Sequence, residues 1–186
     1  SAFMQTNAAR YAAFKRLAAR GGGITALHWS VGAKDAQYIP GQLELLGATR
    51  GGPQRKYVES LGDYKRVDPK HPILTGVEDF TAFDEHYYRL ERRPEVQPLL
   101  TVHLENQDEM VAWAFERADK GRSFGFVGLH FHANWQYPVY RRFVVQGVRW
   151  TLNLSIPKGG SNVDIDPKAL ELDGKLPPLP RAGSAK

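Results

Sequence analysis

The most regular hydrophobic pattern in the chain lies between residues 138 and 153. Apolar side chains recur there at the i, i+3, i+4, i+7 spacing of an amphipathic helix. Pro138 suits the first helical position, where no backbone donor is needed. The pattern predicts a helix that lies on a sheet. The side chains expected in the core are Tyr140, Phe143, Val144 and Val148, and those expected on the polar face are Arg141, Arg142, Gln146 and Arg149.

A second amphipathic pattern opens the chain and leads into a strand. Thr6 is the expected N-cap, and Arg20 with Gly21 provides a basic last turn and a glycine stop. The apolar stripe of this helix consists of Tyr11, Phe14, Leu17 and Ala18. The following apolar run, 24–29, is predicted to be a buried strand that follows a tight glycine turn.

Three further strands are predicted at 98–104, 110–116 and 123–132. Their connections are short and turn-like, which is typical of antiparallel neighbours. Alternate residues of a strand face the same side. The last run therefore places two phenylalanines and, at its C-terminal end, His130 and His132 on one face.

The remaining segments carry weak patterns. Residues 30–72 are rich in glycine and polar residues, and we expect a long loop beside the site with one short helical patch at 42–46. Residues 71–90 are expected to be turn-rich, with aromatic side chains available for packing. We predict one domain over residues 1–157, and a proline-rich tail over 158–186 that wraps the domain or stays loose.

Composition limits the classes of function. The 186 residues are 42% hydrophobic, enough for one core, and no apolar run is long enough to span a membrane. The net charge of +5 comes from scattered pairs of basic residues, which does not favour a nucleic-acid partner. The chain has no cysteine, so disulfides, thiolate metal ligands and a cysteine nucleophile are excluded, while the compartment stays open.

Histidines are the main candidates for chemistry. His28, His130 and His132 all lie near the predicted C-terminal ends of strands, where open α/β sheets bind ligands. If these strands are parallel neighbours, the three imidazoles meet at one edge. Three neutral imidazoles and a water form an open, zinc-like catalytic site. The same histidines equally fit a structural role, in which they hydrogen-bond to carbonyl groups.

Other side chains provide weaker candidates. Glu85, next to Asp84, could act as an acid, a base or a metal ligand; alternatively the two acids lie in a solvated turn. Trp135 and Tyr87 offer flat faces on which a sugar could stack, although aromatics in such places also serve as ordinary packing.

Four segments together resemble the ThuA-like family, named for trehalose utilisation. They are "RGGGITALHW", "HPILTGVEDFTAFDEHYYRL", "MVAWAFERADKGRSFGFVGLHFHANW" and "YRRFVVQGVRWTLN", and the likeness extends from about residue 6 to 157. The resemblance implies an α/β fold of the flavodoxin-like, class I glutamine amidotransferase-like type, with a mostly parallel sheet and an antiparallel extension. Family members begin with two or three strand–helix units before the first helix of this chain. The resemblance therefore implies that these N-terminal units are missing, and that a missing segment, a second chain or a homo-oligomer completes the sheet.

The segment "GLHFHAN" also resembles the amidotransferase segment that carries the catalytic histidine and glutamate. On that comparison His132 corresponds to the histidine and Asn134 to the glutamate. Glutamine amidotransfer is nevertheless excluded, because the chain lacks the cysteine nucleophile and asparagine cannot supply the charge of the glutamate.

The resemblance implies a bacterial protein of sugar metabolism, periplasmic or cytoplasmic, that acts on 3-keto-glycosides or related sugars. We expect His132, His130 and Glu85 to be catalytic, and Trp135, Asn134 and Tyr87 to bind substrate. A zinc-like divalent metal on His28, His130 and His132 is the expected cofactor. The alternative is a non-catalytic carbohydrate-binding or assembly module of the same fold. A bound metal would favour the enzyme, and histidines that are all held by backbone groups would favour the module.

Overall fold

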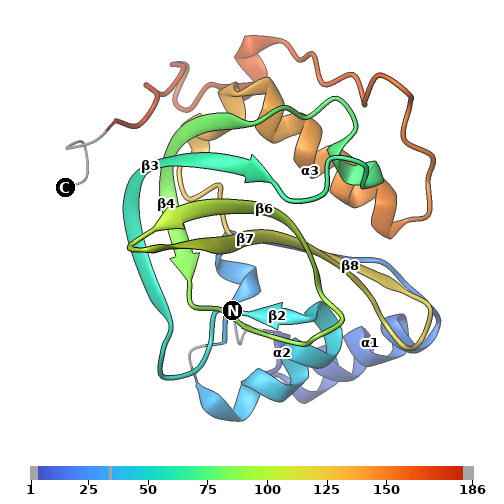
Figure 1. Ribbon diagram of the computed structural model, residues 1–186. Helices are drawn as coiled ribbons and strands as arrows, with labels where there is room; N and C mark the ends of the chain where they lie inside the picture. The colour runs from blue at the N-terminus through green and yellow to red at the C-terminus, as the bar shows by residue number, and fades with distance from the viewer. Residues whose placement is uncertain (1–3, 34, 182–186) are drawn as a thin grey trace.

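The computed structural model describes residues 4–33 and 35–181, and it shows a mixed α/β fold built around a curled six-stranded sheet (Figure 1). The strand order is β1, β8, β7, β6, β3, β4, and a separate pair joins β2 to β5. The strands are β1 Ile24–Leu27, β2 Ala48–Thr49, β3 Lys56–Arg66, β4 Phe80–Tyr88, β5 Glu91–Arg92, β6 Gln97–Leu104, β7 Gln107–Glu116 and β8 Arg122–Phe126. The α-helices are α1 Ala8–Ala19, α2 Ile39–Leu46 and α3 Pro138–Thr151.

Most of the sheet is antiparallel, so the expectation of a mostly parallel sheet is wrong. Strands β1 and β8 are the parallel pair, and each of the other neighbouring pairs in the six-stranded sheet is antiparallel. The reason is that β3, which the sequence pattern does not indicate, pairs with both β4 and β6 in antiparallel orientation. The turns that join β6 to β7 and β7 to β8 are also too short for the crossover that parallel neighbours need.

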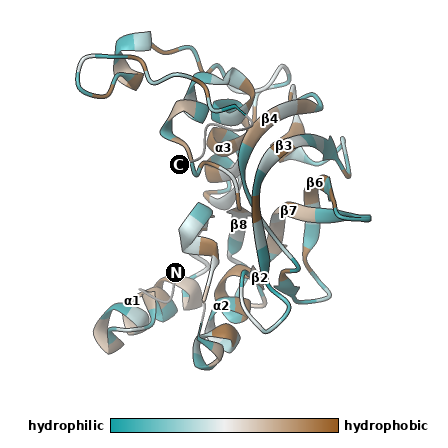
Figure 2. Cartoon of the chain, turned by 90° about the vertical axis from the view of Figure 1, so that its left-hand side faces the viewer, coloured by the Kyte–Doolittle hydropathy of each residue, from teal (hydrophilic) through white to brown (hydrophobic). Residues whose placement is uncertain are grey.

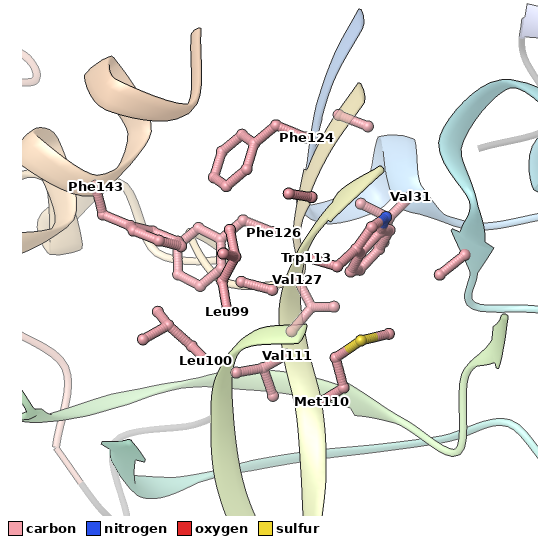
Figure 3. Close-up of a cluster of buried hydrophobic side chains, with 14 of the residues drawn as sticks. Val31, Leu99, Leu100, Met110, Val111, Trp113, Phe124, Phe126, Val127 and Phe143 are labelled. Atoms are coloured by element: carbon pink, nitrogen blue, oxygen red, sulfur yellow. The ribbon is translucent and has the colours of Figure 1, made fainter. Parts of the chain in front are cut away.

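Helices α3 and α2 cover opposite faces of the sheet at β8. Phe124 and Phe126 point towards α3, where their rings meet Phe143 at centroid distances of 5.2 and 5.3 Å (Figure 3). Ser123 faces the other way, and its hydroxyl donates to the carbonyl of Leu45 in α2. Gly125 lies directly against the Trp113 ring, where a Cβ would come within 2.2 Å of that ring.

The predicted helix α3 is confirmed, with two corrections to its faces. Tyr140, Phe143 and Val144 are buried as expected, but Val148 is 37% exposed. Gln146, expected on the polar face, is fully buried. Its side-chain amide donates to the carbonyls of Ile73 and Thr75. The segment around residues 73–75 therefore covers a side of the helix that the sequence pattern assigns to solvent.

The first helix is also confirmed, and its N-cap lies one residue later than expected. Asn7, not Thr6, caps α1 by accepting a hydrogen bond from the backbone N–H of Arg10. The helix ends at Arg20 and Gly21, whose positive φ of 73° suits a glycine. Figure 2 shows α1 at the periphery of the molecule, with mixed hydropathy along its length.

The long strands β3 and β4 lie in segments where a loop and turns were expected. Strand β3 lies inside the segment 30–72, and β4 replaces the turn-rich segment before residue 90. In β3 charged and polar residues are frequent, and β4 carries buried Asp84, Glu85 and His86, so neither shows the simple alternation of apolar and polar residues.

Both histidine-bearing strands are shorter than expected. Strand β1 ends at Leu27, and His28 follows it with φ 45° in a 3₁₀ turn. Strand β8 ends at Phe126, and Leu129 has a φ of 74°. These positive φ values reverse the chain direction, so His130 and His132 do not continue the face of Phe124 and Phe126.

The described part of the tail packs against α3. Arg141 and Arg142 donate from their Nε atoms to the carbonyls of Val163 and Ser161. Val163 itself is buried. Residues 182–186 of the predicted tail lie outside the described residues. None of the described helices has the length and apolar character needed to cross a membrane, as the sequence predicted.

Candidate functional site

Three side chains from distant parts of the sequence meet at the C-terminal ends of β1 and β8. They are His28, Glu85 and His130, which we call the His–Glu cluster; the atoms they offer lie within 4.8 Å of one another. His28 Nε2 is 3.0 Å from His130 Nδ1, and Glu85 Oε2 is 3.4 Å from each of these nitrogens. The curled sheet brings Glu85 here, because β4 at its far edge reaches the ends of β1 and β8.

His28 is held with one ring nitrogen directed into the cluster. Its Nδ1 lies 2.8 Å from the carbonyl oxygen of Val127. A carbonyl can only accept, so Nδ1 carries the proton and Nε2 keeps its lone pair. Tyr87 stacks on the imidazole at 4.8 Å, and a hydroxyl-to-nitrogen distance of 3.1 Å lets it donate to Nε2. Burial lowers the pKa of His28, which favours the neutral imidazole.

Glu85 presents a buried oxygen to the two histidines. Its side chain points from β4 into the cluster, and the residue is 8% exposed, so the alternative of a solvated turn is wrong. Within the part of the chain that the structure describes, Oε2 is buried and has no hydrogen-bond partner. A buried carboxylate oxygen without a hydrogen-bond donor is costly, and this atom faces the ring nitrogens of His28 and His130 at 3.4 Å.

Asp84 positions His130 through the backbone. Its carboxylate accepts hydrogen bonds from the N–H groups of Leu129 at 2.7 Å and of His130 at 3.0 Å. It also accepts from the N–H of Glu85 and from the hydroxyl of Tyr140. One fully buried side chain thus fixes the left-handed turn after β8 and, with it, the place of His130.

A chain of buried polar groups extends from Asp84 into the core. The hydroxyl of Tyr140, which donates to Asp84, lies 3.1 Å from the hydroxyl of Tyr64, and the Tyr64 hydroxyl lies 3.0 Å from His86 Nε2. Burial raises the pKa of both tyrosines well above the usual value and lowers that of His86. All three groups are therefore neutral near pH 7, as a buried hydrogen-bond network requires.

The His–Glu cluster has the dimensions of a divalent metal site. Zinc binds histidine nitrogen and carboxylate oxygen at ~2.0–2.2 Å, which places tetrahedral ligand atoms about 3.3 Å apart. The three separations here are 3.0, 3.4 and 3.4 Å. The bond between His28 and Val127 resembles the second contact by which proteins orient a metal-ligating histidine. Three protein ligands would leave a position open for substrate.

A pocket of about 540 Å³ adjoins the cluster and shares Glu85 with it. We call it the arginine pocket; it is lined by Trp29, Arg50, Pro53, Arg55, Tyr57, Glu85 and Tyr87. Sequence reasoning did not identify Arg50 or Arg55, because both lie in a glycine-rich segment without periodicity. Asp84 was recognised only as a neighbour of Glu85, since nothing in its spacing shows that it binds the turn after β8.

Three of the residues expected at the site lie elsewhere. His132 is exposed and outside the His–Glu cluster; its Nε2 is 3.2 Å from the carbonyl of Leu170. Asn134 is fully buried, and its amide donates to the carbonyl of Phe83. Trp135 packs against the hydrophobic core and does not line the arginine pocket. Tyr87 does line that pocket, as a substrate-binding residue would.

Comparison with known proteins finds a family match for the sequence and similar folds among solved structures. Residues 3–151 match the sequence model of the ThuA family, described as trehalose utilisation. A ThuA-like protein from Bacteroides uniformis has a similar structure, with a TM-score of 0.65 and 16% identity over 80% of this chain. A cytoplasmic protein from Salmonella typhimurium is similar with a TM-score of 0.58 and 16% identity over 80% of this chain. The chain spans 66% and 63% of the lengths of these two proteins. No curated protein matches the sequence.

Proposed function

This chain belongs to the ThuA family of trehalose utilisation, and we propose that it processes a sugar at the His–Glu cluster. The substrate class that we propose is a 3-keto-glycoside or a related keto-sugar. One observation carries the proposal: two histidines and a glutamate converge at metal-ligand spacing beside a pocket, and one buried oxygen of the glutamate has no hydrogen-bond partner among the described residues. Such convergent titratable groups at a cleft are typical of an active site.

We propose that His28 Nε2, His130 Nδ1 and Glu85 Oε2 hold a divalent metal. The donor set suits zinc, and the separations fit tetrahedral coordination. When bound, such a metal polarises a carbonyl and acidifies a neighbouring hydroxyl near neutral pH. Its binding would require the lone pair of His130 Nδ1, so the proton would reside on Nε2 of that ring.

The chain's own groups fit the handling of a keto-sugar. Neutral His28 is held by Val127, and the Tyr87 hydroxyl beside it can donate to a substrate oxygen. Burial, together with the neighbouring Glu85 carboxylate, raises the pKa of Tyr87, so the phenol keeps its proton and remains a donor. The Glu85 carboxylate is the group that can accept a proton from carbon or oxygen next to a carbonyl.

Turnover by matched variants tests this function. The substrate is a synthetic 3-keto-disaccharide, assayed with and without added zinc. We expect Glu85→Gln and His130→Ala to abolish turnover while the melting temperature stays close to that of the wild type. His132→Ala is the control, because His132 lies outside the cluster, and it should retain activity. Loss of turnover in His132→Ala with activity kept in Glu85→Gln would instead support the assignment based on the amidotransferase segment.

A carbohydrate-binding module without catalysis is the second candidate. The observation that favours it is the exposed aromatic surface of the arginine pocket, where Trp29 is 70% and Tyr57 60% exposed. Aromatic faces of this kind stack on sugar rings. Sugar binding in calorimetry with no turnover of any keto-sugar, in the presence of zinc, would favour this module over the enzyme.

A further inference from the structure

We propose that the arginine pocket selects a sugar that carries a negatively charged group, with Arg50 and Arg55 as the binding residues. This inference rests on the proposed function, because it names the substrate class of the same site. The pocket shares Glu85 with the His–Glu cluster, so a ligand held by the two arginines lies next to the reacting groups.

Arg50 presents a guanidinium that is oriented by two tyrosine rings. Its guanidinium carbon lies 4.2 Å from the centroid of the Tyr87 ring and 5.1 Å from that of Tyr57. These two tyrosines are paired across β4 and β3, so they form one aromatic floor beneath the charge. Among the described residues no carboxylate pairs with Arg50, and its Nε is buried without an acceptor. A buried guanidinium donor without an acceptor is costly unless a ligand satisfies it.

Arg55 adds a second positive charge with a fixed orientation. Its Nη1 donates to the carbonyl of Gly52 at 2.6 Å, which leaves its other N–H groups available. The backbone of Gly52 adopts a φ of 75°, the left-handed region that favours glycine. A side chain tied to its own turn in this way loses less rotamer freedom when it binds a ligand, so its cost of ordering is lower.

The charges that line the pocket favour an anion. Two guanidinium groups face one carboxylate, that of Glu85, which is also directed towards the two histidines. Glu59 is paired with Glu85 across the strands but does not line the pocket. A neutral hexose provides no partner for this excess of positive charge. The planar fork of arginine matches a carboxylate or phosphate in two parallel hydrogen bonds.

The aromatic lining requires that the anion belong to a sugar or a similar ring. Trp29 and Tyr57 are the exposed aromatic side chains of the pocket. Inorganic phosphate would satisfy the arginines and leave these faces uncovered. A uronic acid or a sugar phosphate would satisfy both, and the two differ only in the source of the negative charge.

Calorimetric binding of monosaccharides to the full chain tests the inference. The probes are D-glucuronate, D-glucose 6-phosphate and D-glucose. We expect at least one of the two anionic sugars to bind about tenfold or more tightly than glucose, a difference of ~1.4 kcal/mol. Its affinity should fall as salt rises. A preference for glucuronate would identify a carboxylate, and a preference for the phosphate ester would identify a phosphate.

Variants assign the selectivity to the arginines. Arg50→Gln and Arg55→Gln should each remove most of the preference for the anionic sugar, with glucose binding little changed. Arg50→Lys keeps the positive charge but lacks the planar guanidinium that donates two parallel hydrogen bonds. The affinity of this variant for the anionic sugar should therefore lie between those of the wild type and Arg50→Gln. Arg16→Gln, an equal charge change at an exposed site on α1, is the control and should bind like the wild type.

Equal binding of all three sugars, or full selectivity in both glutamine variants, would overturn this inference and leave the proposed function unaffected. Binding of none of the sugars would also overturn this inference, whereas the proposed function would be overturned separately, by absence of turnover of the 3-keto-disaccharide.

Discussion

At the scale of single residues, Asp84 connects the buried core to the candidate site. Its carboxylate holds the N–H groups of Leu129 and His130 and accepts the hydroxyl of Tyr140. In Asp84→Asn one acceptor oxygen becomes a donor, so at least one of these buried groups loses its partner. We expect a loss of ~1–3 kcal/mol in the free energy of unfolding, measured by urea denaturation.

The same substitution should also weaken zinc binding by about 10- to 100-fold, as removal of outer-shell partners generally does. Asp108→Asn is the matched control, because Asp108 is exposed and its ion-pair partner within the described part of the chain is the exposed His103. Unchanged stability together with unchanged zinc affinity in Asp84→Asn would show that the turn after β8 keeps its conformation without the hydrogen bonds of Asp84.

Part of the candidate site could be predicted from the residue types and from the predicted ends of strands. The rest of the site depends on tertiary contacts, which the sequence pattern does not contain. The sequence predicts His28, His130 and Glu85 as site residues, and the structure brings all three together. The prediction that His132 lies beside His130 depends on a continuous strand over both histidines. The positive φ of Leu129 ends that alternation. Such a conformation in a leucine is not predictable from its side chain, since it depends on the buried carboxylate of Asp84.

At the scale of elements, the strength of a periodic pattern decided which predictions were correct. The amphipathic pattern of α3 identified it within a few residues, because one face of it meets the phenylalanines of β8. Strand β4 was not identified, because its buried acids and histidine resemble a polar segment. Burial of those groups depends on partners from β1, β8 and α3, which a local pattern does not contain.

The packing of α3 gives a stability prediction. Phe143 is fully buried between the helix and β8. Phe143→Ala should therefore cost ~3–5 kcal/mol in the free energy of unfolding, as deletion of a buried ring does. Val148→Ala on the partly exposed side of the same helix is the control, and we expect it to cost less than about 1 kcal/mol. Similar losses for the two variants in urea denaturation would mean that α3 is not anchored by its phenylalanine.

His71 gives a prediction about pH. Its Nδ1 accepts the N–H of Ile73 and caps the 3₁₀ turn Pro72–Leu74, and its ring packs on Trp150. Burial lowers the pKa of His71 below its usual value of ~6.5. The unfolded chain therefore takes up more protons as the pH falls through that value, so the free energy of unfolding should fall between pH ~7 and ~5.

His71→Asn keeps an acceptor for the cap but cannot titrate, so part of this dependence on pH should disappear. Urea denaturation at a series of pH values measures it. His86, whose pKa burial also lowers, should account for a remaining part. Identical pH dependence in the wild type and in His71→Asn would contradict the assignment to His71.

At the scale of the whole molecule, the curl of the sheet creates the candidate site. Strands β1 and β4 are the two edges of the sheet, yet His28 after β1 and Tyr87 in β4 are in contact. The fold class and the family could be predicted from the sequence, whereas the mostly antiparallel order could not, since β3 and β4 were not identified.

Zinc stoichiometry tests the central claim most directly. The wild type and the variants Glu85→Gln, His130→Ala and His132→Ala are equilibrated with excess zinc, freed of unbound metal and analysed by elemental mass spectrometry. We predict about one zinc per chain in the wild type and in His132→Ala, and little or none in Glu85→Gln and His130→Ala, because loss of one of the three protein ligands would leave only two to hold the metal. A wild type that retains no zinc, or a His132→Ala variant that loses it while Glu85→Gln keeps it, would contradict the assignment of His28, Glu85 and His130 as one metal site.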